Sequence, residues 1–332
     1  MMPQLRPRGR LVLRSPKNHW WCDQPTQPIR SPEPKMRASC QPTDGPTMTK
    51  DLIPVTTDGD DGGELPPTLR EVLTETLERT ERLHEERGEI TGVPTGFPEL
   101  DRLTSGLQPG NLIVVSSRAA VGQTTLVLDF ARHAAVRAGV PTLLCSLELN
   151  RNEASQRLSC AECSVDLMRL RTGQMEEADW TRLTKSLGRL ADAPIWIDDT
   201  PMSGVTVIFE MAKRLRHRHG LGLLVVDGIQ ALLPFRPVEN VYEQISFSVR
   251  GLKVIARELD IPVVATSPVS RKGEARVDRR PMLSDLRDSG ALEDTADLII
   301  FIYRDEVYDY ESPRKGEADL IIAKQRQGRL TP

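Results

Sequence analysis

The chain has 332 residues and a formal net charge of −3 at neutral pH, and 39% of its residues are apolar. This length allows one large domain or two small ones, and the apolar content supports a buried core. Five widely spaced cysteines fit a reducing compartment better than a disulfide framework. No apolar run approaches the roughly 18 residues of a membrane span, and the N-terminus lacks an apolar signal-peptide core. We therefore expect a soluble, cytoplasmic protein.

The N-terminal segment, residues 1–65, differs in composition from the rest. It is rich in proline and has almost no apolar periodicity, so it cannot bury enough surface to offset its ordering entropy, and we predict disorder. Residues 1–47 carry a net charge of +5, which leaves −8 on residues 48–332. That acidic balance argues against non-specific binding of nucleic acid but not against a local basic channel. The compositional break also suggests that translation begins at Met36 or Met48.

Residues 66–89 read as an amphipathic linker helix. Pro66 and Pro67 open it, and Leu69, Val72, Leu73 and Leu77 recur at helical spacing between charged residues. Such a helix packs on its own domain or on a neighbouring subunit, and the spacing favours neither.

The third segment, residues 90–332, alternates between apolar strands and helical stretches. Strands are predicted at 112–115, 142–147, 194–197, 221–226, 262–266, 298–302 and 318–323, and helices near 123–138, 150–162, 176–192, 204–219 and 240–259. This alternation predicts an α/β fold with a mostly parallel, twisted sheet and helices on both faces. Ligands of such sheets bind at the carboxyl ends of the strands, so site residues should directly follow strands.

Residues 111–125 contain a strand, a loop of small residues and the start of a helix. That arrangement suits a phosphate, because backbone N–H groups and the helix dipole favour an anion there. The pattern Gly-x4-Gly-Lys-Ser/Thr is met in part: Ser117 replaces the first Gly, Gly122 is present, Gln123 replaces the Lys, and Thr124 supplies a hydroxyl for Mg²⁺, with Thr125 beside it. Because the Lys is missing, an ordinary strand–helix turn remains an alternative.

Acidic residues follow three of the other predicted strands. Asp227 ends the run Leu-Leu-Val-Val-Asp, which is how a nucleoside triphosphatase presents an acid to Mg²⁺. Glu148 would polarise an attacking water or, equally, interact with a helix dipole. Asp198 and Asp199 are better explained as turn or cap residues.

A basic segment, residues 271–281, follows the strand at 262–266. It has five Lys and Arg residues and almost no apolar content. It reads either as a mobile loop suited to a nucleic-acid backbone or as a solvated loop.

Several longer motifs, taken in order, resemble one family. They are Ile-Thr-Gly-Val-Pro-Thr-Gly-Phe-Pro-Glu-Leu-Asp (90–101), Gly-Leu-Gln-Pro-Gly (106–110), Ser-Leu-Glu-Leu (146–149), Arg-Thr-Gly-Gln (171–174), Ser-Asp-Leu-Arg-Asp-Ser-Gly-Ala-Leu-Glu (284–293), Ile-Tyr-Arg-Asp-Glu-Val-Tyr (302–308) and Lys-Gln-Arg-Gln-Gly (324–328). Over residues 66–330 the chain resembles the C-terminal motor domain of the DnaB-type replicative helicases, which has a RecA-like P-loop fold.

The resemblance implies a hexameric ring that binds ATP between subunits and single-stranded DNA in its channel. Thr124 and Asp227 would serve Mg²⁺, and Glu148 would orient the water. Lys324 and Arg326 would reach a neighbour's γ-phosphate. Arg287, Asp288 and Gly290, together with Arg271 of the basic segment, would face the DNA, and the helix at 68–87 would dock on the adjacent subunit.

The sequence also departs from the family. Gln123 lacks the charge of the phosphate-binding Lys, Pro268 replaces a Gln that senses the γ-phosphate, and Gly228 replaces an aromatic residue. The family's helical N-terminal domain has no counterpart, and the chain stops at Pro332 before the last strand of the family would finish. The pattern predicts a degenerate paralogue.

Three hypotheses follow from these departures. The chain is a helicase with weakened hydrolysis, an inactive nucleotide- or DNA-binding module that modulates a true helicase ring, or a remnant without stable activity.

Overall fold

A computed structural model describes residues 10–14, 67–86, 90–201, 203–234, 240–270, 273, 276–286, 290–326 and 328. The described residues fall into two units. One holds the first strand and everything from Leu83 onward, and the other holds the first helix as far as Arg82. The first of these units contains the sheet and the candidate site.

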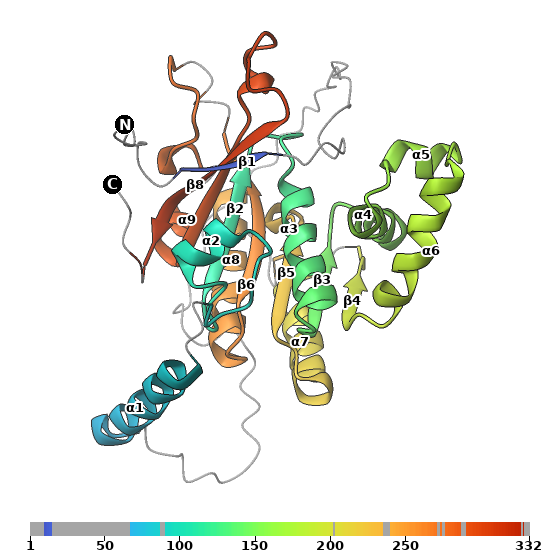
Figure 1. The fold of residues 1–332 in the computed structure, drawn as a ribbon. Helices are drawn as coiled ribbons and strands as arrows, with labels where there is room; N and C mark the ends of the chain where they lie inside the picture. Colours follow the sequence, from blue (N-terminus) through green and yellow to red (C-terminus); the bar gives the residue numbers. More distant parts are fainter. Residues whose placement is uncertain are drawn as a thin grey trace, which may run out of the picture. The chain divides into compact units, whose positions relative to one another are not determined.

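The elements alternate along the chain as periodicity predicts (Figure 1). The strands are β1 (Arg10–Arg14), β2 (Leu112–Ser117), β3 (Thr142–Ser146), β4 (Ile195–Asp198), β5 (Leu223–Asp227), β6 (Val263–Pro268), β7 (Leu298–Tyr303) and β8 (Glu317–Gln325). The α-helices are α1 (Leu69–Glu86), α2 (Pro98–Thr104), α3 (Gln123–Arg132), α4 (Arg151–Cys163), α5 (Leu167–Thr172), α6 (Glu177–Ala191), α7 (Val205–His219), α8 (Val241–Glu258) and α9 (Gly290–Thr295). A π-helical turn, His133–Arg137, extends α3, and short 3₁₀ turns lie at Ile229–Ala231, Leu283–Asp285 and Asp305–Val307.

The strands form one sheet in the order β1-β8-β7-β2-β6-β5-β3-β4. The six strands from β7 to β4 are parallel, so their carboxyl ends meet at one edge of the sheet. The last strand, β8, is antiparallel to β7 and therefore ends at the opposite edge. This difference in direction decides which candidate residues can meet within one chain.

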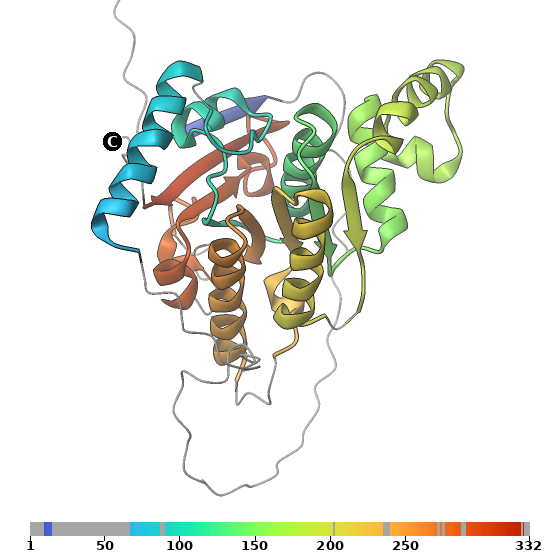
Figure 2. The same cartoon turned by 90° about the horizontal axis from the view of Figure 1, so that it is seen from below.

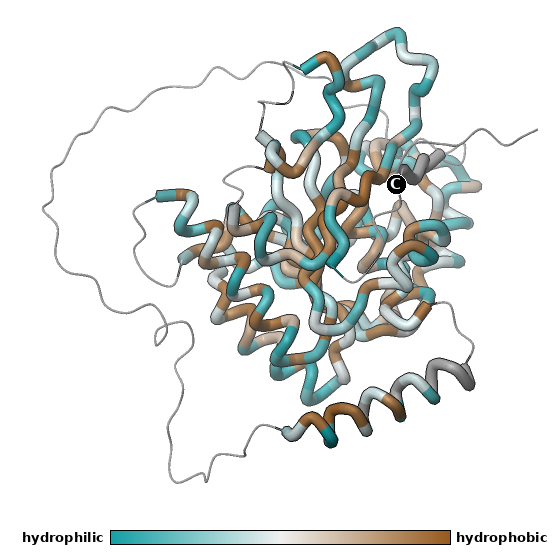
Figure 3. The backbone as a smooth tube through the Cα atoms, turned by 90° about the vertical axis from the view of Figure 1, so that its left-hand side faces the viewer, coloured by the Kyte–Doolittle hydropathy of each residue, from teal (hydrophilic) through white to brown (hydrophobic). Residues whose placement is uncertain are grey.

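Helices cover both faces of the sheet, and Figure 2 shows α7 and α8 on one face and α3 on the other. The first apolar cluster joins α7, α8 and α9 to residues such as Val114, Val226 and Ala265, and the second joins α2, α3 and α4 to their sheet neighbours on the other face. The parallel strands are therefore buried on both sides, which explains their continuous apolar runs. They form the apolar centre of the tube in Figure 3.

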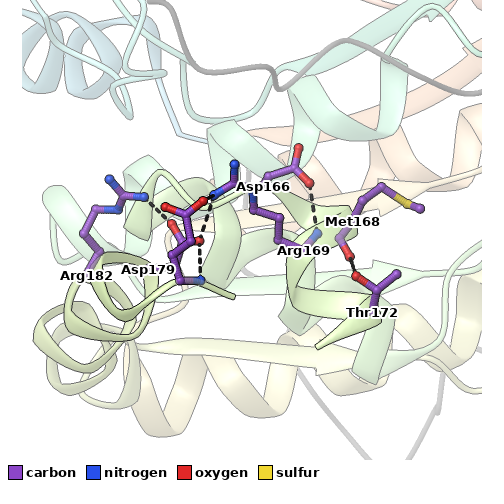
Figure 4. Close-up of polar contacts among 7 residues, drawn as sticks. Asp166, Met168, Arg169, Thr172, Asp179 and Arg182 are labelled. Carbon is purple, nitrogen blue, oxygen red and sulfur yellow. Dashed lines mark hydrogen bonds and ion pairs between the residues drawn. The ribbon is translucent and has the colours of Figure 1, made fainter. Parts of the chain in front are cut away.

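The helices α4, α5 and α6 form a helical module between β3 and β4. Figure 4 shows the buried Asp179 of α6 between Arg169 of α5 and Arg182, and Arg169 NH1 lies 3.2 Å from Asp179 Oδ2. A second buried carboxylate, Glu162 of α4, pairs with arginines of α3, the π-helical turn and α6. The ion pairs of Glu162 connect the module to α3, the helix that follows β2.

The predicted elements are largely confirmed. All seven strands and five helices expected from periodicity are present. Their ends are shifted by at most two residues, except that α3 ends at Arg132 and the π-helical turn completes the helix predicted as far as residue 138. The helices α2, α5 and α9 were not predicted, because six or seven residues are too few to display a helical period.

The prediction that residues 1–65 lack order is wrong at Arg10–Arg14. These residues form β1, which pairs antiparallel with β8 and sets Arg14 opposite Glu317. The free edge of β8 explains the added strand. The other residues of that segment lie outside the described ranges.

The helix α1 follows the prediction for 66–89. Thr68 caps it, because the backbone N–H of Glu71 donates to Thr68 Oγ1 and the Glu71 carboxylate accepts from the Thr68 N–H. Its leucines at 69, 73 and 77 are exposed. Among the described residues, no helix is long and apolar enough to cross a bilayer.

Candidate functional site

The loop between β2 and α3 has the backbone of a phosphate cradle. Gly122 caps α3 with φ of +110°, a conformation that side chains strongly disfavour, and Ala120 also has a positive φ of 62°. The first N–H groups of α3, including those of Gln123, Thr124 and Thr125, have no intrahelical acceptor. They lie at the positive end of a ten-residue helix. The loop therefore offers donors and a partial positive charge to an anion.

The two side chains that depart from the phosphate-loop pattern lie against each other. Gln123 Nε2 donates to Val115 O at 2.9 Å, and Gln123 Oε1 lies 3.4 Å from Ser117 Oγ. Ser117 Oγ also lies 2.8 Å from Arg118 O. Pro268 at the end of β6 is in register with Ser117. The amide of Gln123 is thus held at the end of β2.

Thr124 and Asp227 are brought together as their expected role in metal binding requires. Thr124 Oγ1 donates to Asp227 Oδ1 at 3.2 Å, and Thr266 Oγ1 donates to the same oxygen at 2.9 Å. Asp227 is 1% exposed, and its other oxygen, Oδ2, has no hydrogen-bond partner. Burial raises the pKa of Asp227. An orphaned buried carboxylate oxygen beside a hydroxyl fits a hydrated Mg²⁺ bound to a phosphate.

Glu148 joins the same group of residues. It lies two residues after the end of β3 and against Gly228, where an added Cβ would be 3.1 Å from Glu148 Cγ. Gly228 has φ of +105°, so a side chain there would be strained and would also displace Glu148. Partial burial raises the pKa of Glu148, and the neighbouring Asp227 raises it further. The carboxylate is suited to accept a proton from a water at the mouth of the loop.

Lys324 and Arg326 lie at the opposite edge of the sheet from these residues. Lys324 pairs with Ile299 near the start of β7, whereas Ser117 ends β2. A six-residue strand spans about 20 Å, which no side chain bridges. Lys324 Nζ donates to the carbonyl oxygens of Glu293 and Asp294 at the end of α9, and Arg326 NH1 lies 3.2 Å from Asp297 Oδ1. Neither residue can reach the cradle of its own chain.

The residues predicted to contact DNA are only partly described. Arg271, Arg287 and Asp288 lie outside the described residues, whereas Gly290 begins α9.

The described part of the basic segment makes several contacts with neighbouring elements. Arg276 forms a two-pronged ion pair with Asp285, Arg279 NH1 donates to Tyr308 O at 3.0 Å, and the Arg280 guanidinium lies 5.9 Å from the Tyr303 ring centre. A carboxylate and two aromatic rings on neighbouring elements hold these arginines in place.

The sequence did not predict the cleft next to the cradle. Tyr303 and Tyr308 stack with ring centres 5.4 Å apart, and the guanidinium of Arg118, in the cradle loop, lies 5.4 Å from the centre of the Tyr308 ring. The cleft beside them has a volume of about 400 Å³ and is lined by Val277, Asp278, Arg279, Arg280, Tyr303, Asp305, Tyr308 and Asp309. The motif at 302–308 marked the tyrosines, but their contact with Arg118 joins residues 190 positions apart. An aromatic and guanidinium surface of this kind suits the flat face of a nucleobase.

Taken together, the sheet order, the cradle after β2 and the acids after β3 and β5 define a RecA-like P-loop fold. A family model described as "DnaB-like helicase C terminal domain" matches residues 92–332. The chain belongs to this family.

Curated relatives and solved structures agree with the family assignment. The replicative DNA helicases of Leifsonia xyli subsp. xyli and Bacillus subtilis are 43% and 42% identical to this chain over 260 and 261 residues, which is 78% of this chain. The chain spans only 57% and 58% of their lengths. A solved structure described as an ATPase domain superposes with a TM-score of 0.74 at 36% identity and covers 82% of this chain and 94% of that one. A DnaB-like replicative helicase, described with its primase interactions, gives 0.72 at 36% identity and covers 82% and 64%.

Proposed function

We propose that the chain is the motor domain of a DnaB-like, ATP-dependent DNA helicase that acts in replication in the cytoplasm. It would assemble as a hexameric ring, alone or mixed with a full-length replicative helicase, and bind single-stranded DNA in the channel. The family assignment and the names of the relatives support this reading. The contact between Thr124 and Asp227 beside the cradle is the observation that carries it.

The cradle would bind ATP with Mg²⁺. Backbone N–H groups at Gly122 to Thr125 suit the α- and β-phosphates. Thr124 and Asp227 would hold Mg²⁺ through its water ligands, and the metal would neutralise phosphate charge. Glu148 would orient the attacking water and take its proton, because its raised pKa brings it nearer to that of a base at neutral pH. The base would stack in the cleft on Tyr308, next to Arg118.

The site would be completed by a neighbouring subunit. Lys324 and Arg326 are positive, lie at the far edge of the sheet, and are suited to stabilise negative charge on the neighbour's γ-phosphate. The exposed apolar face of α1 would dock on an adjacent subunit, because a helix with exposed leucines gains from burying them. Arg271, Arg287, Asp288 and Gly290 would face the single-stranded DNA in the channel.

Hydrolysis would be weakened. A unit-charge contact at about 4 Å with an effective dielectric near 20 is worth roughly 4 kcal/mol, or about three decades in rate or affinity. Gln123 keeps a donor but not the charge, and Pro268 has no side-chain donor or acceptor. The inward hydrogen bond from Gln123 to Val115 O favours the second candidate as well, an inactive module that joins and modulates a true helicase ring.

Steady-state ATP hydrolysis with Mg²⁺, with and without single-stranded DNA, tests the proposal. The wild-type protein is compared with Gln123→Lys and Glu148→Gln. We expect slow hydrolysis that DNA stimulates, that Glu148→Gln abolishes and that Gln123→Lys raises. If the wild-type protein does not hydrolyse ATP and Gln123→Lys restores hydrolysis, the result would favour the modulating subunit. If neither the wild type nor Gln123→Lys hydrolyses ATP, the result would contradict a role as a motor.

A further inference from the structure

The phosphate loop contains two non-consensus residues that contact each other. Ser117 stands at the position of the first Gly and Gln123 at that of the Lys, and the structure sets Ser117 Oγ 3.4 Å from Gln123 Oε1. The other end of the amide donates to Val115 O. Both ends of the Gln123 side chain therefore have partners within the chain, and turning it toward a phosphate would break contacts worth about 1 kcal/mol each.

The charge around the loop is unfavourable for a terminal phosphate. Two carboxylates, Glu148 and Asp227, line it, and the Oδ2 atom of Asp227 is buried without a partner. The guanidinium of Arg118 lies over the ring of Tyr308. A γ-phosphate adds negative charge near these carboxylates, and among the described residues no lysine of the same chain lies beside the loop to offset that charge.

Other cations within the described residues do not replace the missing lysine. Lys324 and Arg326 are tied to α9 and Asp297 at the far edge of the sheet. Arg157 of α4 is close enough to Asp227 to lower the pKa of that carboxyl. Its positive charge therefore compensates the Asp227 carboxylate rather than a phosphate.

The donors for the inner phosphates are intact. The first N–H groups of α3 have no acceptor within the helix, and in P-loops such groups cradle the α- and β-phosphates while the lysine reaches the β- and γ-phosphates. Thr124 still presents its hydroxyl next to Asp227. This chain therefore keeps its own donors for the α- and β-phosphates but lacks its own lysine for the γ-phosphate.

We propose that this nucleotide site is a nucleoside-diphosphate site, which binds ADP at least as tightly as ATP because its Ser117–Gln123 pair occupies the place of the lysine. The inference rests on the nucleotide binding proposed above. It makes product retention, rather than a failed chemical step alone, a cause of weak turnover. It also leaves recognition of the γ-phosphate to the Lys324 and Arg326 side chains of the neighbouring subunit.

Calorimetric titration of the full chain with ADP and with ATP, each with Mg²⁺, tests the inference. Both nucleotides are also titrated into the Glu148→Gln variant, which prevents hydrolysis and allows the two affinities to be compared within one protein. We expect equal affinity or a preference for ADP. The double variant Ser117→Gly with Gln123→Lys should shift the preference toward ATP by about tenfold or more, since it restores one charge. Gln174→Lys, which adds the same charge on the exposed loop between α5 and α6, should leave the preference unchanged.

The outcomes separate this inference from the proposed function. A wild-type protein that binds ATP tenfold more tightly than ADP overturns the diphosphate site and leaves the motor domain standing. A wild-type protein that binds neither nucleotide, beside a double variant that binds ATP, also overturns the diphosphate site alone. If neither the wild type nor the double variant binds ADP or ATP, both the diphosphate site and the proposed function are contradicted.

Discussion

Removal of the buried carboxylate of Glu162 should be one of the most destabilising single changes in the domain. Its side chain has no exposed surface, and it lies 2.7 Å from Arg132 NH1 of α3, 2.6 Å from Arg137 NH2 of the π-helical turn and 3.3 Å from Arg189 NH2 of α6. Removing one partner of a buried ion pair costs about 3–5 kcal/mol. The three guanidinium groups are partly exposed and can regain water, so we expect Glu162→Gln to cost about 2–4 kcal/mol.

Thermal unfolding followed by circular dichroism measures this cost. For a domain of this size, 1 kcal/mol corresponds to about 2–4 °C, so Glu162→Gln should lower Tm by about 5–15 °C. The loss should persist at 1 M salt, because buried pairs are screened little. The control is Glu176→Gln, whose carboxylate pairs with Arg169 at 2.8 Å but is largely exposed, and we expect it to change Tm by about 2 °C at most. Equal effects of the two variants would refute the view that Glu162 ties α3 to the helical module.

Two further predictions concern the nucleotide site. Burial raises the pKa of Asp227, so the folded protein holds this proton to higher pH than the unfolded chain does, and nucleotide-free stability falls as pH rises above about 4. Asp227→Asn should therefore raise Tm in EDTA at pH 7.5, by an amount that shrinks toward pH 4, and thermal melts over that range would contradict this reasoning if the variant were less stable at pH 7.5. Tyr308→Ala should weaken ATP binding about 5- to 100-fold, the worth of stacking one base, without changing the affinity for tripolyphosphate in the same calorimetric assay. If Tyr308→Ala weakened the binding of ATP and of tripolyphosphate equally, the nucleobase would not stack on Tyr308.

Much of the fold could be predicted from the sequence, because parallel strands buried on both faces leave continuous apolar runs. The run Leu223–Asp227 is an example: the four apolar residues predicted a buried strand, and the acid after them predicted a group at the carboxyl edge. Glu148 was expected at the same edge for the same reason, and the two acids do interact there.

The remaining features depend on contacts that local sequence does not encode. Arg118 and Tyr308 meet because β7 lies beside β2, and strand order is not visible in a pattern of apolar residues. The strand β1 forms because β8 leaves an edge to pair with. The hydrogen bond from Gln123 to Val115 O needs a side-chain rotamer, which a motif does not specify. The ion pair between Arg276 and Asp285 likewise joins the basic segment to a residue that its composition does not indicate.

The central claim is that the catalytic site is shared between subunits, since Lys324 and Arg326 lie one strand length from the cradle of their own chain. Mixing two inactive proteins tests it most directly, with both made in the Gln123→Lys background so that turnover is measurable. One carries Glu148→Gln, and the other carries Lys324→Ala with Arg326→Ala. We predict that the mixture regains DNA-stimulated ATP hydrolysis, because some interfaces then join an intact Glu148 to intact cations. Full activity of the Lys324→Ala, Arg326→Ala protein by itself would contradict the claim.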